Sequence, residues 1–187
     1  MPNWCNNTLE LQHDNPEMIE RAFKSLKDDR FFKEFFPCPK ELTETVSGSS
    51  GEGYAKELHE FQMQLNKKYF GFVDWYDWTV ANWGTKWDVC EAYCDQHEPN
   101  LLVASYDTAW SPPIAFYEKM KELGFTVRAF YYEPGMAFCG NWDDGDDNYY
   151  SIEGNSKWVS ENIPDEIDSE FGISEGMAIW EDEEEEV

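Results

Sequence analysis

The spacing of apolar and polar positions changes several times along the chain, and each change marks an element. Residues 3–12 alternate between the two classes, which predicts a strand with one buried side. Asp14 or Asn15 then precedes Pro16, a combination typical of a helix start, and the apolar residues that follow recur at helical spacing. The ring-rich segment 31–39 ends in two prolines and is expected to lie extended over the core.

Two helices are predicted in the middle of the chain, after a stretch rich in Gly and Ser. That stretch, residues 47–53, is the loop most expected to be disordered. The helix over about 54–69 carries one apolar stripe, formed by Tyr54, Leu58, Phe61, Leu65 and Tyr69. The shorter helix over about 74–83 begins at Asp74 and ends at Gly84, because glycine readily takes the left-handed conformation that closes helices.

The second half of the chain reads as strands around a single helix. Strands are predicted at 87–95, 101–106, 125–132, 136–142 and 148–152. Ser111 is expected to cap the helix that starts at Pro112 and stops at Gly124. The acidic run 143–147 is expected to form the hairpin loop before the last strand.

This element order predicts the fold class and the division of the chain. A β-α-β-β-α-β order with helices inserted after the first helix (about 54–84) is the split pattern of ferredoxin-like folds. We therefore expect an α+β domain over 1–152, an antiparallel sheet with its helices on one face.

The pattern weakens beyond residue 153, where an acidic extension (153–187) is predicted. Residues 156–171 are compatible with one or two short helices anchored by Trp158, Ile163, Ile167 and Phe171. The run of carboxylates at 181–186 repels itself and is expected to be disordered.

Charge divides the chain more sharply than hydropathy does. Residues 1–140 hold 22 acidic and 13 basic residues, a balance of −9, whereas residues 141–187 hold 17 and one, a balance of −16. A phosphate-binding surface needs a basic footprint. We therefore expect no direct binding to nucleic acid and none to anionic lipid.

The cysteines and the first residues indicate a compartment. Five Cys without a regular framework are typical of reduced thiols in the cytoplasm, which is the host cytoplasm if the protein is encoded by a phage. The first residues lack the basic and apolar regions of a signal peptide, and no apolar run approaches the ~20 residues that span a bilayer.

Motifs for catalysis or metal binding do not stand out. The three His residues are not spaced against Cys as zinc ligands, and 143–148 lacks the ligand spacing of a calcium loop. A nucleophile elbow, a phosphate-cradling glycine loop and a dinucleotide fingerprint are also missing from the sequence. We expect a protein without a metal, a cofactor or an enzymatic activity.

The most unusual stretch is 75–88, in which Trp residues are mixed with polar ones. Similar mixtures occur at other predicted strand ends, and together they define a polar and aromatic cluster: Asn3, Trp4, Trp78, Asn82, Trp83, Thr85, Lys86, Trp87, Asp107, Trp110 and Glu133. One interpretation is a pocket with aromatic walls for a small molecule or nucleotide. The other is a packed network in which the polar groups satisfy backbone atoms.

Four blocks of sequence resemble the YubB-like (ferredoxin-like) family found on plasmids and in bacteriophages. They are 3–9 (Asn-Trp-Cys-Asn-Asn-Thr-Leu), 78–88 (which includes Asn-Trp-Gly-Thr-Lys-Trp-Asp), 108–113 (Thr-Ala-Trp-Ser-Pro-Pro) and 133–140 (Glu-Pro-Gly-Met-Ala-Phe-Cys-Gly). The resemblance covers about 1–152 and implies a ferredoxin-like sheet. It implies no reaction and no catalytic residue, and the acidic extension is not part of the shared pattern.

These observations lead to two hypotheses. The first is a phage- or plasmid-type accessory protein that binds a basic host protein, as a DNA mimic would in anti-restriction or anti-CRISPR function. The surface expected to bind consists of Asp143, Asp144, Asp146, Asp147, Glu153, Glu161, Asp165, Glu166, Asp168 and Glu170. The alternative is a small-molecule or nucleotide binder, or an enzyme, that uses the Trp-rich cluster.

Overall fold

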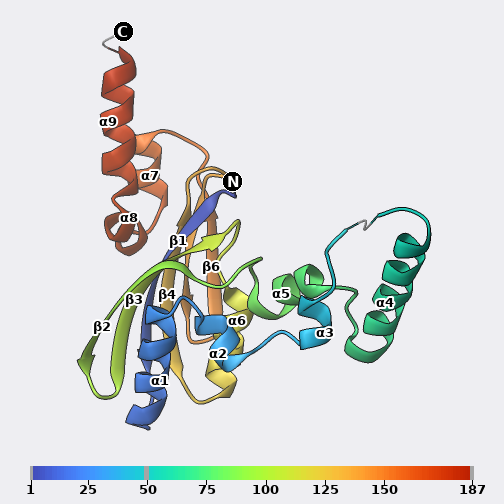
Figure 1. The fold of residues 1–187 in the computed structure, drawn as a ribbon. Helices are drawn as coiled ribbons and strands as arrows, with labels where there is room; N and C mark the ends of the chain where they lie inside the picture. Colours follow the sequence, from blue (N-terminus) through green and yellow to red (C-terminus); the bar gives the residue numbers. More distant parts are fainter. Residues whose placement is uncertain (1, 49–50, 186–187) are drawn as a thin grey trace.

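A computed structural model describes residues 2–48 and 51–185 and has one antiparallel sheet of order β2-β3-β1-β4-β5-β6 (Figure 1). The strands are β1 Trp4–Gln12, β2 Cys90–Glu98, β3 Leu101–Ala109, β4 Thr126–Glu133, β5 Phe138–Asp143 and β6 Asp146–Ser151. The order β2-β3-β1-β4 is that of the split β-α-β pattern, and the β5-β6 hairpin widens it. The predicted α+β class and ferredoxin-like sheet are confirmed.

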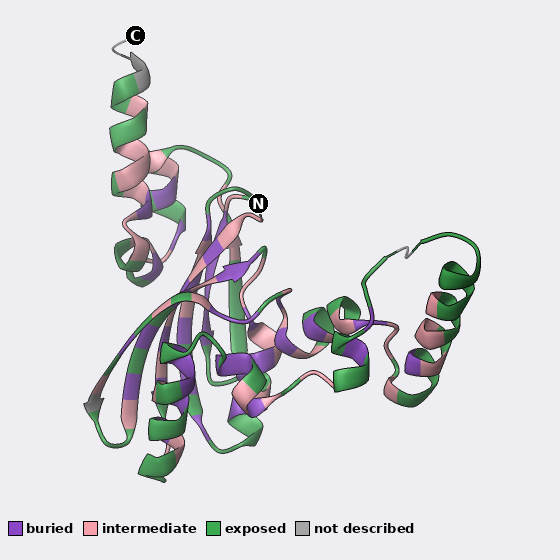
Figure 2. Cartoon of the chain, in the orientation of Figure 1, coloured by how far each residue is buried: buried purple, intermediate pink, exposed green. Residues whose placement is uncertain are grey.

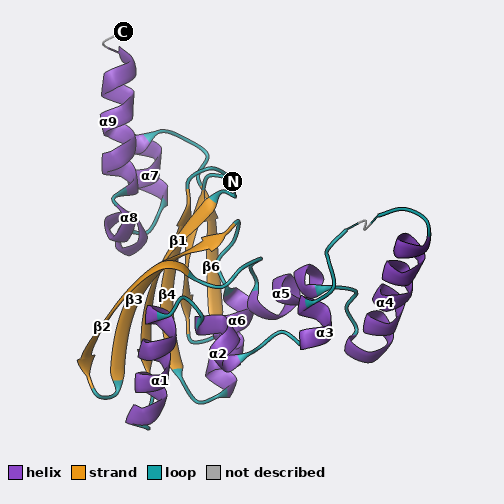
Figure 3. Ribbon diagram, in the orientation of Figure 1, coloured by secondary structure: helices purple, strands orange, loops and turns teal. Residues whose placement is uncertain are grey.

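Helices α1 (Pro16–Lys27) and α6 (Ile114–Glu122) cover one face of this sheet (Figure 3). Alternate side chains of β1 point to that face and are buried, among them Leu9 and Leu11, because successive strand residues face opposite sides. They join a core rich in rings, in which Phe32 and Phe116 have centroids 4.5 Å apart. This face is the main core of the domain.

Local capping explains why some helices were predictable. The side chain of Asn15 accepts a hydrogen bond from the backbone N–H of Glu17 at 3.0 Å and begins α1. Asp74 does the same for Asp77 at 3.1 Å and begins α5 (Trp75–Trp83). Gly84 ends α5 with φ +87°, and a Cβ there would lie 3.0 Å from backbone of the α6 start, so only glycine fits.

The prediction of an extended segment over 31–39 is wrong. Residues Phe31–Phe35 form a short helix, α2, and Lys40–Thr43 form another, α3. The first turn of α2 has no local side-chain cap. Instead the carboxylate of Asp88 accepts hydrogen bonds from the backbone N–H groups of Phe32 at 2.8 Å and Lys33 at 3.0 Å. A cap more than fifty positions away leaves no local signal.

Helix α4 (Tyr54–Phe70) forms the insert together with α5, near the predicted bounds. Its apolar stripe is exposed, with Tyr54 at 79% and Phe61 at 57%, and the helix stands away from the sheet (Figures 1 and 2). Its attachment includes Asn66, whose amide donates to Thr45 Oγ1 and to the carbonyl of Val73, both at 2.9 Å. Residues 49–50 of the loop predicted to be disordered lie outside the described residues.

The acidic extension folds as α7 (Ser156–Asn162), α8 (Asp165–Phe171) and α9 (Ile173–Glu185). It packs on the second face of the sheet, over β4, β5 and β6, through an apolar cluster of Cys139, Val159, Ile163, Ile167 and Ile173. Helices therefore lie on both faces, whereas the sequence placed them on one. Residues 181–185 belong to α9, so the prediction of a disordered run is wrong there.

Three smaller predictions also differ from the structure. The side chain of Ser111 donates to the carbonyl of Gly84 at 2.6 Å and does not cap α6, whose N-cap is Pro113. The hairpin turn is shorter than 143–147, because Asp143 ends β5 and Asp146 begins β6. Strand β2 begins at Cys90 rather than at residue 87, and its register with β3 shifts twice.

Candidate functional site

A pocket with aromatic walls lies where α2, α5 and the starts of β1 and β2 meet. Its volume is about 360 Å³, within the range of ligand sites, and it is more apolar than polar. Its lining is Trp4, Lys33, Cys38, Thr43, Trp75, Thr79, Trp83, Lys86, Trp87, Asp88, Val89 and Cys90. Four members of the predicted cluster line it: Trp4, Trp83, Lys86 and Trp87.

Two buried polar contacts fix the inner wall of this pocket. The indole N–H of Trp83, only 2% exposed, donates to the carbonyl of Phe36 at 2.9 Å. The carboxylate of Asp88 also accepts from its neighbour Val89 at 3.0 Å, in addition to capping α2. Burial raises the pKa of Asp88 above its usual value. The three backbone donors act in the opposite direction but do not cancel the effect of burial. The inner wall is therefore satisfied within the protein, and Asp88 serves the fold.

The outer wall of the pocket combines rings with cations. Trp4 and Trp87 have centroids 6.3 Å apart at an interplanar angle of 48°. The ammonium group of Lys86 lies 4.7 Å above the ring of Trp87 and 5.6 Å above that of Tyr76. In the described part of the chain, neither Lys86 nor Lys33 forms an ion pair. Lys86 therefore lies over two rings without an ion pair, whereas the charge of Lys33 acts on the nearby carboxylate of Asp88.

The remaining members of the predicted cluster do not line the pocket. They are Asn3, Trp78, Asn82, Thr85, Asp107, Trp110 and Glu133. Thr85 Oγ1 donates to the carbonyl of Ala109 at 2.9 Å, and the Asn82 amide donates to that of Trp78 at 2.9 Å. Asp107 accepts from the amide of Asn6 at 2.7 Å. These contacts support the packed-network interpretation for this part of the cluster.

Glu133 and Asn3 meet at the end of the sheet formed by the start of β1 and the ends of β3 and β4. Glu133, 1% exposed, accepts from the backbone N–H groups of Gly135 and Met136 and so holds the turn after β4. The carbonyl of Asn3 accepts from the backbone N–H of Trp110 at 3.0 Å. The blocks thus converge, but around backbone groups rather than around the pocket.

The two thiols at the pocket are not activated. Burial, together with nearby Asp74, raises the pKa of Cys38 to about 11. Burial and neighbouring carboxylates also raise the pKa of Cys90. A thiol reacts as a nucleophile through its thiolate, which a raised pKa disfavours. The pocket is suited to binding through rings and cations rather than to covalent catalysis by cysteine.

The predicted acidic surface divides into structural and free carboxylates. Asp168 accepts from the backbone N–H of Ser174 at 2.7 Å and from its hydroxyl at 2.6 Å, which joins α8 to α9. Glu166 pairs with Arg128 at 2.9 Å, and Glu161 pairs with Lys157 at 3.7 Å. The exposed members Glu153, Asp165 and Glu170 have no ion pair within the described ranges.

The four carboxylates of the β5-β6 hairpin do not all lie on the same face of the sheet. Asp143 and Asp146 are cross-strand neighbours, and the alternation along each strand puts them on the face that carries α8. Asp147 lies on the other face and accepts from the hydroxyl of Tyr131 at 2.8 Å. Asp144, at the turn, pairs with Lys121 at 3.6 Å. Only part of the hairpin therefore continues the acidic face of the extension.

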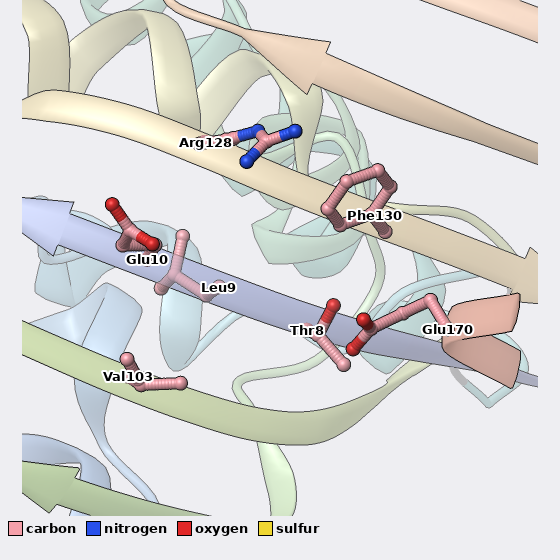
Figure 4. A pocket seen from close by; sticks show the side chains of 7 residues that line it. All are labelled: Thr8, Leu9, Glu10, Val103, Arg128, Phe130 and Glu170. Atoms are coloured by element: carbon pink, nitrogen blue, oxygen red, sulfur yellow. The ribbon is translucent and has the colours of Figure 1, made fainter. Parts of the chain in front are cut away.

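The extension leaves part of the second sheet face uncovered. A shallow hollow of about 200 Å³ lies there, between the β3-β1-β4 surface and Glu170 of α8 (Figure 4). It is lined by Thr8, Leu9, Glu10, Val103, Arg128, Phe130 and Glu170. The hollow contains two carboxylates, Glu10 and Glu170, and one guanidinium, that of Arg128, which pairs with Glu166 of α8.

Two general findings limit the chemistry of the described residues. They contain no group of three or more His, Cys, Asp or Glu placed to hold a metal ion. None of their helices is long and apolar enough to cross a membrane.

Comparison with known proteins adds one structural similarity. No family model matches the chain, and no curated protein does. The chain is similar to the crystal structure of the protein api92 from Yersinia pseudotuberculosis, of the DUF1281 family, with 10% identity and a TM-score of 0.47. The similarity covers 83% of this chain and 99% of that one. At this level it carries no argument about function.

Proposed function

We propose that this protein binds the basic surface of a host protein through its folded acidic extension. The observation that carries the proposal is the anchoring of that extension: buried Val159, Ile163 and Ile167 fasten it to the sheet. Carboxylates on an anchored scaffold keep fixed spacings, whereas those on a loose tail do not. The proposal includes membership of the YubB-like family and a phage or plasmid origin, as the four sequence blocks suggest.

The electrostatics favour fast and selective association with a basic partner. Residues 141–187 contribute −16 of the net charge of −25, and a field of one sign raises association rates with oppositely charged grooves. A groove that normally holds DNA carries the complementary positive charge. An acidic surface that binds in this groove would release counterions, as the binding of DNA does. The sharper form of the proposal is therefore a DNA mimic that occupies the DNA site of a restriction or CRISPR enzyme.

The test is capture of purified DNA-binding defence enzymes by the full chain, with elution by duplex DNA. The informative variant neutralises free carboxylates only, as Glu153→Gln, Asp165→Asn, Glu170→Gln, Glu175→Gln and Asp182→Asn, and keeps the structural Asp168. We expect capture by the native chain, at least a tenfold loss in the variant, and release by DNA.

A matched control neutralises the same number of exposed carboxylates that form no ion pair within the described ranges, at Asp14, Glu17, Glu41, Glu52 and Glu118. The control should keep capture, because those residues lie outside the extension. Equal capture by both variants, or no release by DNA, contradicts the proposal. Removal of the whole extension is a poorer test, since it would expose the apolar cluster around Cys139.

The pocket supports a second candidate function, the binding of a planar anion such as a nucleotide. Rings of Trp4, Trp75 and Trp87 offer stacking surfaces, and the ammonium groups of Lys33 and Lys86 offer charge for a phosphate or carboxylate. The carrying observation is that Lys86 lies over the rings of Trp87 and Tyr76 and has no ion-pair partner in the described residues, although carboxylates are abundant.

A titration of Trp fluorescence with nucleoside mono- and triphosphates tests this candidate. We expect quenching that weakens at least tenfold in Lys86→Gln. Lys27→Gln is the control, because Lys27 also lies over a ring, that of Phe23 at 4.3 Å, but neither residue lines the pocket. Unchanged quenching in Lys86→Gln, or no quenching by any nucleotide, removes the support for this function.

A further inference from the structure

Helix α4 presents an apolar seam that the described part of the chain leaves largely exposed, with only Leu65 half-buried. Tyr54 is 79% exposed, Leu58 56%, Phe61 57% and Tyr69 70%. Not one described residue of α4 belongs to the three apolar clusters that hold the rest of the protein together. Contiguous exposed groups of this size mark interaction surfaces.

The spacing of the seam favours another helix as its occupant. Tyr54, Leu58, Phe61 and Leu65 follow one another by four, three and four residues, which is the alternation of a and d positions in a heptad. A straight seam of this kind accepts the side chains of a second helix between its own. Its 17 residues span about 25 Å, which is long enough for two heptads.

The charges beside the seam have opposite sign at its two ends. Glu57 lies in the first turn and Lys68 in the last. Lys68 follows Phe61 by seven residues and so ends the seam itself, while Glu57 lies beside the start of the seam. Neither forms an ion pair among the residues that the structure describes, whereas Lys56 pairs with Glu60 at 3.7 Å. In an antiparallel pair of α4 helices, Glu57 of each helix would therefore lie near Lys68 of the other.

We infer that the occupant is a second copy of this chain, with the two α4 helices antiparallel about a two-fold axis. The axis passes near Phe61, so Leu58 of one copy faces Leu65 of the other, and Glu57 comes within reach of Lys68. A parallel pair would instead place like charges together. A two-fold pairing uses the same surface on both copies and closes at two.

The arrangement also keeps the acidic extensions apart. Figure 1 shows α4 and α9 at opposite ends of the molecule, so pairing through α4 leaves both extensions pointing outward. Repulsion between exposed charges is screened beyond about 8 Å at physiological ionic strength. The negative charge of the extensions therefore does not oppose this dimer.

Sedimentation velocity of the full chain between about 5 and 500 μM tests the inference. One helix pair buries little area, so we expect a dissociation constant on the order of 10–100 μM. Phe61→Glu places two carboxylates at the axis and should abolish the dimer over the whole range. Ile179→Glu on α9 is the matched control, because Ile179 is 56% exposed and the added charge is the same; it should dimerise normally.

A charge swap tests the antiparallel orientation. Glu57→Lys and Lys68→Glu should each weaken association about three- to tenfold, and the double variant should restore it. The two residues lie too far apart on one helix to restore each other within a single copy. A chain that stays monomeric throughout, or a dimer that survives Phe61→Glu, overturns the inference. Failure of the swap to restore association overturns the antiparallel pairing.

Discussion

The C-terminal extension and helix α4 of the insert are both helical additions to the ferredoxin-like sheet, but only the extension buries its apolar side chains. The extension buries Ile163 to 4% exposure and Ile167 to 0%, against the second sheet face. The insert leaves Leu58 and Phe61 more than half exposed. Both segments have helical periodicity. The difference teaches that periodicity identifies an apolar face but not the surface that will cover it.

The first way to sharpen this comparison uses the thiol beneath the extension. Cys139 is fully buried among the anchors of α7 and α8. Ile167→Asp should detach the extension and raise the rate of Cys139 alkylation more than about 100-fold, because an exposed thiol both ionises and meets the reagent. Mass spectrometry of the alkylated peptide measures this rate. Phe61→Asp on α4 should leave it unchanged, and equal rates in both variants would contradict the anchoring.

The second prediction compares stabilities directly. Ile167→Ala removes a fully buried side chain and should lower the free energy of unfolding by about 3 kcal/mol. Leu58→Ala, on the exposed seam, should change it by less than about 0.5 kcal/mol at low micromolar protein. Urea denaturation followed by circular dichroism measures both. A loss of about 2 kcal/mol or more in Leu58→Ala would mean that α4 packs on its own chain.

The third prediction concerns pH. Burial, and to a smaller degree the nearby carboxylate of Asp168, raises the pKa of Cys139 from 9.0 to about 11. A raised thiol pKa means that folding favours the protonated form, so this contribution is complete below pH 9 and is lost as pH rises from 9 towards 11. The native chain should lose more stability than Cys139→Ser over that window. Parallel pH curves for the two chains would count against burial of this thiol.

The smallest expected effect separates structural from free carboxylates within the extension. Asp168→Ala removes the two hydrogen bonds to Ser174 and should cost about 1 kcal/mol. Asp165→Ala, on the same helix, should cost less than about 0.5 kcal/mol, because Asp165 is exposed and its side chain caps nothing. Thermal unfolding compares them. The reverse order would show that the assignment of free and structural carboxylates is mistaken.

The sequence predicted those parts of the fold whose causes are local. Asn15 and Asp74 start helices within three residues of the groups they cap, and the alternation of β1 lies within one segment. Helix α2 could not be predicted in this way, because its cap is Asp88. Helix α9 was missed because its carboxylates suggested a tail, although Ile173 at its start is buried.

Only part of the candidate pocket could be predicted, because some of its lining residues depend on contacts that are distant in the sequence. The Trp-rich stretch 75–88 supplied half of the lining, including Trp83 and Trp87. Lys33 and Cys38 lie in a segment that the sequence predicts to be extended, so the sequence does not place them at the pocket. Their place in the pocket depends on the fold of α2, and hence on a contact that no local pattern records. Nothing in the spacing distinguished the pocket residues from the packed ones, such as Thr85.

The sheet order has a consequence for assembly in the cell. The outer strands β2 and β6 offer unpaired backbone groups, to which a strand of another molecule would add. Strand β2 carries Glu91 and Glu98 and is broken by its register shifts, and β6 begins with Asp146 and Asp147. Charge and irregularity on an edge discourage such strand addition. Both margins of the sheet therefore carry features that disfavour β-augmentation and edge-to-edge aggregation.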